Sequence, residues 1–287
     1  MFNRPEMLYL SLKSEIEARK YYDPGDFFTI FAVDFGGDPK CIEILKDYPF
    51  EHEIVIRPFR YRVCANIMEA LKLASKYGSE FFINIEDDVV LHKTFFKFID
   101  LARENIKDNY SVLTTWGMSA FGDPSILKRG NFSCGPGTVI SKYFFDKYML
   151  PHANTNYYNN WIPTIDAVNK RNEANAFAKY SVKKKNQHDH LDWDGLMNRL
   201  VDTALFEEEI YSYSSLCYRL LHIGFYGFNR QHGRFPMFLN TFEKRAEFLE
   251  KGIKNPSILE ALDGVYKDYS TFDPQLDAWD ETLKLEE

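Results

Sequence analysis

Three adjacent carboxylates, those of Glu86, Asp87 and Asp88, directly follow the apolar run 81–85 (FFINI). A short apolar run of this kind predicts a buried strand. Neighbouring negative charges at its end repel one another unless a positive charge offsets them. Hard divalent cations prefer oxygen ligands, so the triplet favours a metal site. The alternative is a polar turn before a helix, because acidic residues also favour helix starts.

Asp34 stands in the same position relative to another apolar run, residues 27–33, and Gly36 and Gly37 follow closely. Its carboxylate is placed to accept hydrogen bonds from a ribose hydroxyl or a base N–H, and the glycines let a ligand approach the backbone. An aspartate after a strand often only caps a turn. Taken alone, Asp34 leaves both interpretations open.

Asp192, Trp193 and Asp194 open a helical pattern after the polar segment 151–190. An indole ring offers a face to the C–H side of a sugar, and a flanking aspartate can act as a general base. These features favour a sugar site in which Asp192 or Asp194 removes a proton. The alternative is a helix cap.

His222 stands between Leu221 and Ile223 in the run 221–224 (LHIG). A histidine flanked by apolar residues is more often a satisfied core residue than a metal ligand. Because the acid triplet elsewhere in the chain also predicts a metal site, the core and metal-ligand interpretations of His222 are about equally favoured. We therefore include His222 with Asp88 among the predicted metal ligands.

Strands and helices alternate through the first two-fifths of the chain. The predicted elements are, in order, 27–34, 53–59, 66–77, 81–85, 93–106 and 111–116, of which the third and fifth are helices. This alternation is typical of an α/β fold with a largely parallel sheet. Ligands of such sheets bind beyond the carboxyl ends of the strands, where Asp34 and the acid triplet stand.

The rest of the chain gives weaker patterns. Residues 151–190 predict long polar loops with short helices, 192–205 a helix, and 210–224 a strand-like stretch. Surface helices are predicted at 242–269, and the acidic residues from 273 onward predict a loosely packed tail.

The composition narrows the possible functions. Across 287 residues the net charge is −7, which argues against nucleic-acid binding, and 45% apolar residues exclude bulk disorder.

No apolar run is long enough for a membrane span, although peripheral membrane contact stays open. Four scattered cysteines without a CxxC motif exclude a zinc ribbon, and no signal-peptide pattern is present, so we expect a cytoplasmic protein. The 16% aromatic content favours stacking on bases or sugars, or else a phenylalanine-rich core.

The order of these motifs resembles the GT-A glycosyltransferases, and in particular the N-acetylglucosaminyltransferase I group. The motifs that carry the resemblance are Asn3-Arg4-Pro5, the strand ending at Asp34, the triplet 86–88, the glycine-rich turn 133–138, the Trp-Asp pair 193–194 and the run 222–224. It extends loosely from residue 3 to about residue 233. In that family a first strand precedes the arginine motif, whereas only Met1, Phe2 and Asn3 do so here, so we expect a very short or truncated first strand.

The resemblance implies a Rossmann-like GT-A fold with a mixed, mostly parallel central sheet flanked by helices. It implies a donor-binding half at 1–120, an acceptor-binding and catalytic half at 121–240, and C-terminal helices with an acidic tail at 241–287. The implied activity is transfer of a hexose or N-acetylhexosamine from a nucleotide-sugar donor, expected to be UDP-linked, to a hydroxyl of a glycan or glycolipid acceptor. Inversion at the anomeric carbon is expected.

The resemblance also implies roles for individual residues. Asp88 would ligate Mn²⁺ or Mg²⁺, while Glu86 and Asp87 would contact the ribose or the donor sugar. The residues that would hold the nucleotide are Arg4, Asp34 and, at the base, Asn66.

The catalytic base implied by the resemblance is an aspartate of the Trp-Asp segment. The family carries adjacent acids there, whereas Gly195 follows Asp194 in this chain. The base is therefore Asp194 or Asp192, and we favour Asp194.

Three alternatives are weighed against this activity. A glycoside hydrolase uses two carboxylates spaced across the bond, which adjacent acids do not suggest. A sugar-phosphate nucleotidyltransferase would carry a glycine-rich N-terminal phosphate loop, which the sequence lacks. A catalytically inactive glycan-binding protein on the same fold is the third alternative, because Gly195 follows Asp194 where the family carries a second acid.

Overall fold

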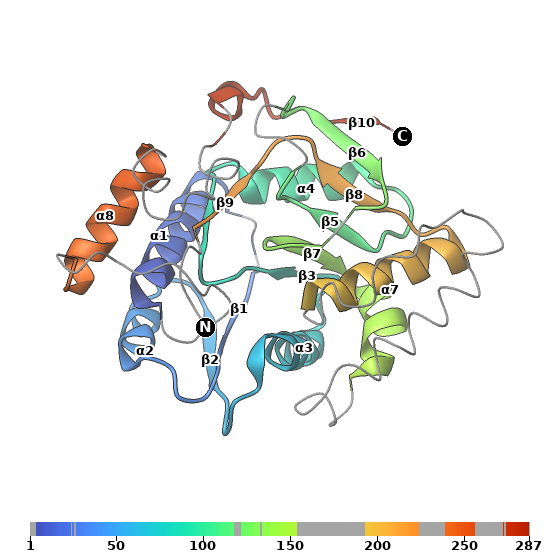
Figure 1. The fold of residues 1–287 in the computed structure, drawn as a ribbon. Coiled ribbons are helices and arrows are strands. Elements are labelled where there is room, and N and C mark those ends of the chain that lie inside the picture. The colour runs from blue at the N-terminus through green and yellow to red at the C-terminus, as the bar shows by residue number, and fades with distance from the viewer. Residues whose placement is uncertain are drawn as a thin grey trace.

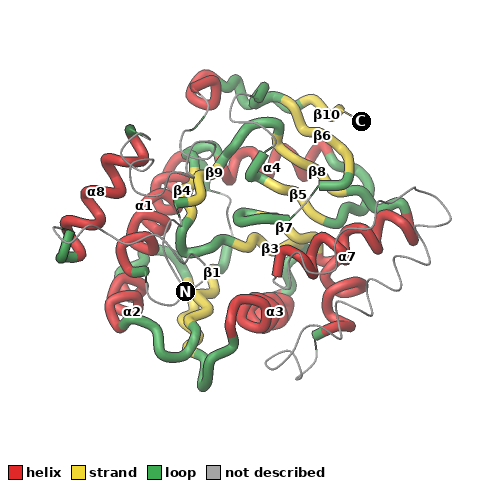
Figure 2. The backbone as a smooth tube through the Cα atoms, viewed as in Figure 1, coloured by secondary structure: helices red, strands yellow, loops and turns green. Residues whose placement is uncertain are grey.

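The computed structural model describes residues 4–23, 25, 27–117, 122–132, 134–153, 193–223, 239–255, 272 and 274–286. The chain forms an α/β fold in which strands make the middle layer and helices lie around them (Figures 1 and 2). The α-helices are α1 Pro5–Tyr21, α2 Pro39–Lys46, α3 Arg62–Ala74, α4 Phe95–Asn105, α5 Lys142–Phe144, α7 Trp193–Glu208 and α8 Phe242–Lys254. The shorter helical turns are η1 Ser75–Tyr77, η2 Phe145–Met149, η3 Leu150–His152 and η6 Pro274–Ala278. No helix among the described residues is long and apolar enough to cross a membrane.

The strands of the described residues form three groups. The central sheet has the order β10-β6-β8-β5-β7-β3, and two pairs stand beside it, β1 with β2 and β4 with β9. The bounds of the strands are β1 Thr29–Val33, β2 His52–Ile56, β3 Phe81–Asn84, β4 Val89–Leu91, β5 Val112–Thr114, β6 Ile126–Gly130, β7 Thr138–Ser141, β8 Ser212–Ser215, β9 Leu220–His222 and β10 Lys284–Glu286.

Strand directions define two edges of the central sheet. Strand β7 runs antiparallel to β3 and to β5, and β8 runs parallel to β5, so β3, β5 and β8 all end on the same side. We call this side the carboxyl edge; Asn84, Thr114 and Ser215 end their strands there. The opposite side, where Phe81 and Ser212 begin their strands, is the amino edge.

The prediction of a mostly parallel central sheet is wrong for the described strands. Three of the five pairings in this sheet are antiparallel, those of β6 with β8, β5 with β7 and β7 with β3. The cause is two strands that the sequence analysis did not anticipate. Strand β6 carries Lys128 and Arg129 and lacks an apolar run, and β7 is only four residues long. Strand β7 lies antiparallel between β5 and β3, and β6 pairs antiparallel with β8.

Helices cover both faces of the central sheet. Successive side chains of a strand point to opposite faces, so each strand contributes to the packing on both sides. Val112 and Ile140 face one side, where they join a buried cluster with α3 and α7. Leu113 and Val139 face the other side, where α4 packs. Helices α3 and α4 match their predicted positions. Phenylalanine contributes strongly to this core, since the fully buried side chains include Phe95, Phe96, Phe98, Phe144 and Phe145.

Helix α1 was not predicted, although it places part of the site. It begins with Pro5, which suits the first turn because its missing N–H would have no partner there. On one side Met7 and Leu10 pack with Val90 and Leu249. On its other side the helix packs on β1 and α2 through a second buried cluster. Figure 1 shows α1 between α2 and α8. A helix buried on two sides has no single apolar stripe, so its sequence lacks the amphipathic pattern.

The C-terminal segment packs more closely than a loose tail. Trp279 is buried, and its ring lies 4.2 Å from the guanidinium carbon of Arg219. Arg219 is completely buried, and Phe98 covers it at 4.1 Å. Its nitrogens donate to Ser215, Thr94 and the Pro124 carbonyl. Strand β10 then pairs with β6, so the predicted loose tail is instead attached to the central sheet.

Candidate functional site

The acid triplet lies in the connection between β3 and β4, directly beyond the carboxyl edge. Strand β3 ends at Asn84, and β4 begins at Val89 and pairs antiparallel with β9. In that register Val89 lies opposite His222, and the Ile223 N–H donates to the Asp88 carbonyl at 2.7 Å. Asp88 and His222, which are 134 residues apart in the chain, thus become neighbours.

Glu86, Asp88 and His222 form a group that could hold a metal ion. One potential ligand atom from each residue lies within 4.8 Å of the others. Asp88 is buried, whereas Glu86 and His222 are half-buried. Two carboxylate oxygens and one imidazole nitrogen suit several divalent cations, so the donor set alone does not select the metal.

Two buried carboxylate oxygens make this group suitable for an additional cation. Oδ2 of Asp87 and Oδ1 of Asp88 have no hydrogen-bond partner among the described residues. A buried, unpaired carboxylate oxygen is energetically costly, and a bound cation would remove that cost. The residues present therefore fit a metal ion.

An internal cation already contacts two of the acids. Arg4 donates from Nη1 to Asp88 Oδ2 and from Nη2 to Asp87 Oδ1, each at 2.5 Å. Arg4 is the residue directly before α1, and the helix is attached to the acid loop further along. Ser11 donates to the Glu86 carbonyl at 3.4 Å, and Ser14 accepts from the Leu91 N–H at 2.9 Å. Contact of Arg4 with a nucleotide, implied by the resemblance, stays a prediction.

These charges keep Asp88 ionised. Burial raises the pKa of Asp88, but the neighbouring His222 and Arg4 lower it by more, so the pKa lies below its usual range. Nε2 of His222 lies 3.1 Å from Asp88 Oδ2, at hydrogen-bond distance. A metal ligated by that nitrogen would have to replace its proton.

Asp34 organises the loop after β2. Its Oδ1 accepts from the Phe35 N–H at 3.0 Å and from the Tyr61 N–H at 2.6 Å. Asp34 is buried, and these bonds fasten the start of α3 to the end of β1. The turn-capping interpretation is thus present in the structure, and a contact with ribose or base stays a prediction.

Asn66 is committed to contacts inside the protein. Its Oδ1 accepts from Arg57 Nε at 2.7 Å, and its Nδ2 donates to the Ala32 carbonyl at 3.0 Å. Arg57 also donates to the Asn66 carbonyl. The sequence analysis missed Arg57, whose only signal is a basic residue at the end of a predicted strand. Contact of Asn66 with a base stays a prediction.

Three aromatic side chains stand next to Asp34, and we call them the aromatic rim: Phe35, Phe59 and Tyr61. Phe35 is 54% exposed and Phe59 47% exposed. The Phe59 and Tyr61 rings lie 4.7 Å apart, and the Arg57 guanidinium lies 5.1 Å from the Tyr61 ring. Large exposed rings are costly in water and are typical of surfaces that bind a partner or ligand.

The structure describes only part of the segment that carries the two candidate bases. Asp192 lies outside the described residues. Trp193 and Asp194 begin α7, as the helical pattern predicted, but their side chains are also outside the description. The choice between the two aspartates therefore stays a prediction.

The start of α7 belongs to the carboxyl edge. Oδ1 of Asn198, in the second turn, accepts from the Cys134 N–H at 2.8 Å. The same glycine-rich turn contacts the end of β3, because the Gly137 N–H donates to the Asn84 carbonyl at 2.8 Å. Gly137 has a φ of 74°, and a Cβ there would lie 2.1 Å from a Leu220 methyl, so only glycine fits. The turn therefore connects α7 to the end of β3, two residues before the acid triplet.

No protein-family model and no curated protein matches this chain. The site is therefore interpreted from its own geometry and from the short motifs that the sequence contains.

The low pKa of Asp88 predicts a specific acid response. In the unfolded chain an aspartate titrates near pH 3.9, so the stabilisation by ionised Asp88 is complete above that pH and is lost as the pH falls further. We expect the difference in unfolding free energy between the wild type and Asp88→Asn to narrow below about pH 4. Urea unfolding at several pH values measures this, with the exposed Asp47→Asn as control. A difference that stays constant with pH would contradict the assignment.

The contacts of Arg4 predict that its positive charge compensates the negative charges of Asp87 and Asp88. Arg4→Gln leaves two buried carboxylates without their cation and should lower the unfolding free energy by about 3–5 kcal/mol. If the acid site holds a metal, millimolar Mn²⁺ should restore part of that loss, because a ligand that binds only the folded state stabilises it.

The matched control for Arg4→Gln is Lys13→Gln, which breaks the exposed ion pair with Glu250. Its cost should be below about 1 kcal/mol. An Arg4 variant that loses no more stability than this control, or gains no more from Mn²⁺ than the wild type, would refute the compensating role.

Proposed function

We propose that the protein is a metal-dependent glycosyltransferase that moves a sugar from a nucleotide-sugar to a hydroxyl of a glycan or glycolipid acceptor. The observation that carries the proposal is the group Glu86, Asp88 and His222 beyond the carboxyl edge, with buried carboxylate oxygens that no described residue satisfies. Ligands of α/β sheets bind at this edge. The motif resemblance to GT-A enzymes supports the same reaction class.

The donor side of the proposal rests on two features. Mn²⁺ or Mg²⁺ held by Asp88, His222 and Glu86 would supply positive charge to the departing diphosphate. The aromatic rim beside Asp34 offers exposed ring faces on which a nucleobase can stack. A UDP-linked donor is the expectation from the resemblance.

The acceptor side uses a general base from the start of α7. Asp194, or Asp192 as the alternative, would take the proton from the acceptor hydroxyl while that oxygen attacks the anomeric carbon. The hydrogen bonds that connect α7 to the glycine-rich turn support a position of this helix near the acids. A single displacement of this kind inverts the anomeric configuration.

A catalytically inactive glycan-binding protein is the second candidate, and one observation favours it. Arg4 and His222 already contact Asp88, so the acid charge is partly compensated without a metal. A purely structural triplet would be held in the same way. A sugar-phosphate nucleotidyltransferase is a weaker alternative, because the sequence carries no glycine-rich N-terminal phosphate loop.

The proposed donor site predicts a metal-dependent ligand response. One class among UDP-, GDP-, CMP- and dTDP-sugars should raise the unfolding temperature only when Mn²⁺ is present, since a ligand of the native state stabilises it by mass action. Asp88→Asn should abolish the response and Asp47→Asn should not. No response to any donor in folded wild-type protein would contradict the transferase and favour the inactive glycan-binding protein.

If Asp194 is the general base, its substitution should affect turnover but not donor binding. Asp194→Asn should keep the donor response and lower the rate of transfer or donor hydrolysis by about 10²–10⁴-fold, the range for a general base. Product formation by chromatography measures this, with Asp192→Asn in parallel. A full loss in Asp192→Asn together with an active Asp194→Asn would reverse the assignment.

A further inference from the structure

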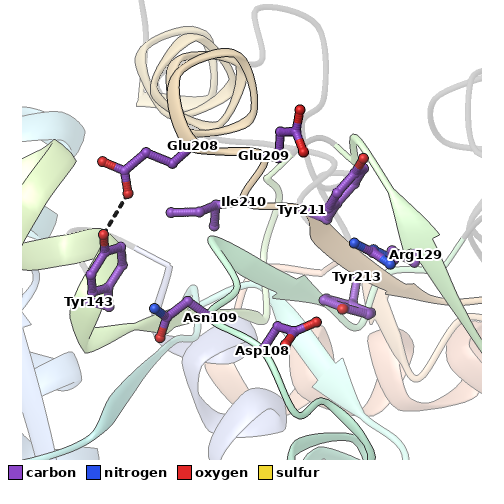
Figure 3. Close-up of a pocket in the computed structure, with 9 residues that line it drawn as sticks. All are labelled: Asp108, Asn109, Arg129, Tyr143, Glu208, Glu209, Ile210, Tyr211 and Tyr213. Atoms are coloured by element: carbon purple, nitrogen blue, oxygen red, sulfur yellow. Dashed lines mark hydrogen bonds between the residues drawn. The ribbon is translucent and has the colours of Figure 1, made fainter.

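A cavity of about 330 Å³ lies at the amino edge of the central sheet (Figure 3). The acid triplet follows β3 at the opposite, carboxyl edge. The loop between α7 and β8 contributes Tyr211, and the residues before β5 contribute Asn109. Arg129 comes from the end of β6, and Tyr143 comes from α5, directly after β7. Four neighbouring strands of the sheet therefore place these side chains around one space.

This cavity is separate from the candidate metal group. The strands between the two edges are three to five residues long, and four residues of strand span about 13 Å. None of the residues that line the cavity belongs to the acid triplet, the aromatic rim or β9. The proposed transfer reaction does not use it.

The lining combines aromatic rings with flat polar side chains. Tyr143, Tyr211 and Tyr213 bring rings whose faces are apolar and whose edges carry a hydroxyl (Figure 3). Asn109 adds an amide that both donates and accepts hydrogen bonds, and Arg129 adds a planar guanidinium with several donors. A sugar ring presents C–H groups on its faces and hydroxyls, which donate and accept, around its rim. Such a ligand matches this lining.

The charges in the cavity disfavour anionic ligands. Asp108, Glu208 and Glu209 outnumber Arg129, so a phosphate or a carboxylate would meet net repulsion. Glu208 itself is engaged by Lys147 and by the Tyr143 hydroxyl, at 2.6 Å for the latter.

A small organic cation is also disfavoured. The Arg129 guanidinium lies 4.0 Å from the centre of the Tyr211 ring, so the position that a cation would take over that ring is already filled. A second cation beside Arg129 would be repelled. The remaining class is a neutral ligand with many hydroxyl groups, and the volume is at the small end for ligand pockets.

The backbone at the mouth of the cavity is unusual. Glu209 has a φ of 56°, in the left-handed region that non-glycine residues seldom adopt. Such conformations persist where the surrounding structure holds them, and they are enriched at binding sites. Here the conformation shapes the connection from α7 to β8 that carries Tyr211.

We propose that this amino-edge cavity is a binding site for a neutral carbohydrate, the size of one or two sugar units. The site is distinct from the proposed donor and acceptor positions and does not require that the acid triplet transfers a sugar. In a transferase it would hold a distant part of a glycan chain.

The test is saturation-transfer difference NMR on the full chain with four neutral probes, N-acetylglucosamine, chitobiose, mannobiose and lactose. Spermidine and glucose 6-phosphate serve as cationic and anionic probes. At least one neutral sugar should bind. Tyr211→Ala and Asn109→Ala should each lower the affinity for that sugar by tenfold or more. Asn109 is exposed, so its substitution leaves the fold intact even if Tyr211→Ala does not.

Two controls separate this site from the rest of the protein. Tyr77→Ala removes a tyrosine that is 51% exposed and stacks on Phe28, outside the cavity lining, and it should not change binding. Asp88→Asn should not change it either. The proposal is overturned if no neutral sugar binds, if binding survives Asn109→Ala, if only Asp88→Asn abolishes it, or if a charged probe binds more tightly. An absent donor response with intact sugar binding would refute the transferase alone.

Discussion

The pairing of Arg4 with Asp87 and Asp88 is the constraint on which the carboxyl edge depends. Adjacent carboxylates at the end of a buried strand repel each other, and burial strengthens that repulsion. One guanidinium, using two separate nitrogens, offsets it for both aspartates. Arg4 reaches them only because α1 is packed on two sides and hydrogen-bonded to the acid loop through Ser11 and Ser14. The helix and the acid loop therefore hold each other in place.

The two edges of the central sheet carry different chemistry. The carboxyl edge concentrates charge, with acids, a histidine and an arginine whose positions are set by hydrogen bonds and strand register. The amino edge carries rings and flat polar groups around a cavity, in which acidic side chains outnumber the single arginine. A sheet of short strands places both surfaces on one small domain without contact between them.

The sequence predicted the elements whose patterns are local. Apolar runs identified β1, β2, β3 and β5, and helical periodicity identified α3 and α4. Strand β6 was missed because Lys128 and Arg129 interrupt its pattern, and α1 because burial on two sides leaves no single stripe. Grouping of His222 with Asp88 was anticipated from chemistry, whereas the contacts of Arg4 and the Arg57–Asn66 pair depend on long-range packing that no local pattern encodes.

The position of Trp279 has a consequence for how the chain reaches its final state. During synthesis the segment around Arg219 leaves the ribosome some 60 residues before Trp279 does, and domains fold as units as they emerge. Until Trp279 arrives, one face of the Arg219 guanidinium lacks its ring partner, and the edge of β6 lacks β10. The nascent domain therefore stays incomplete until residues 274–286 have been made, and a ribosome that stalls after β9 would display an unfinished sheet edge to the quality-control machinery of the cell.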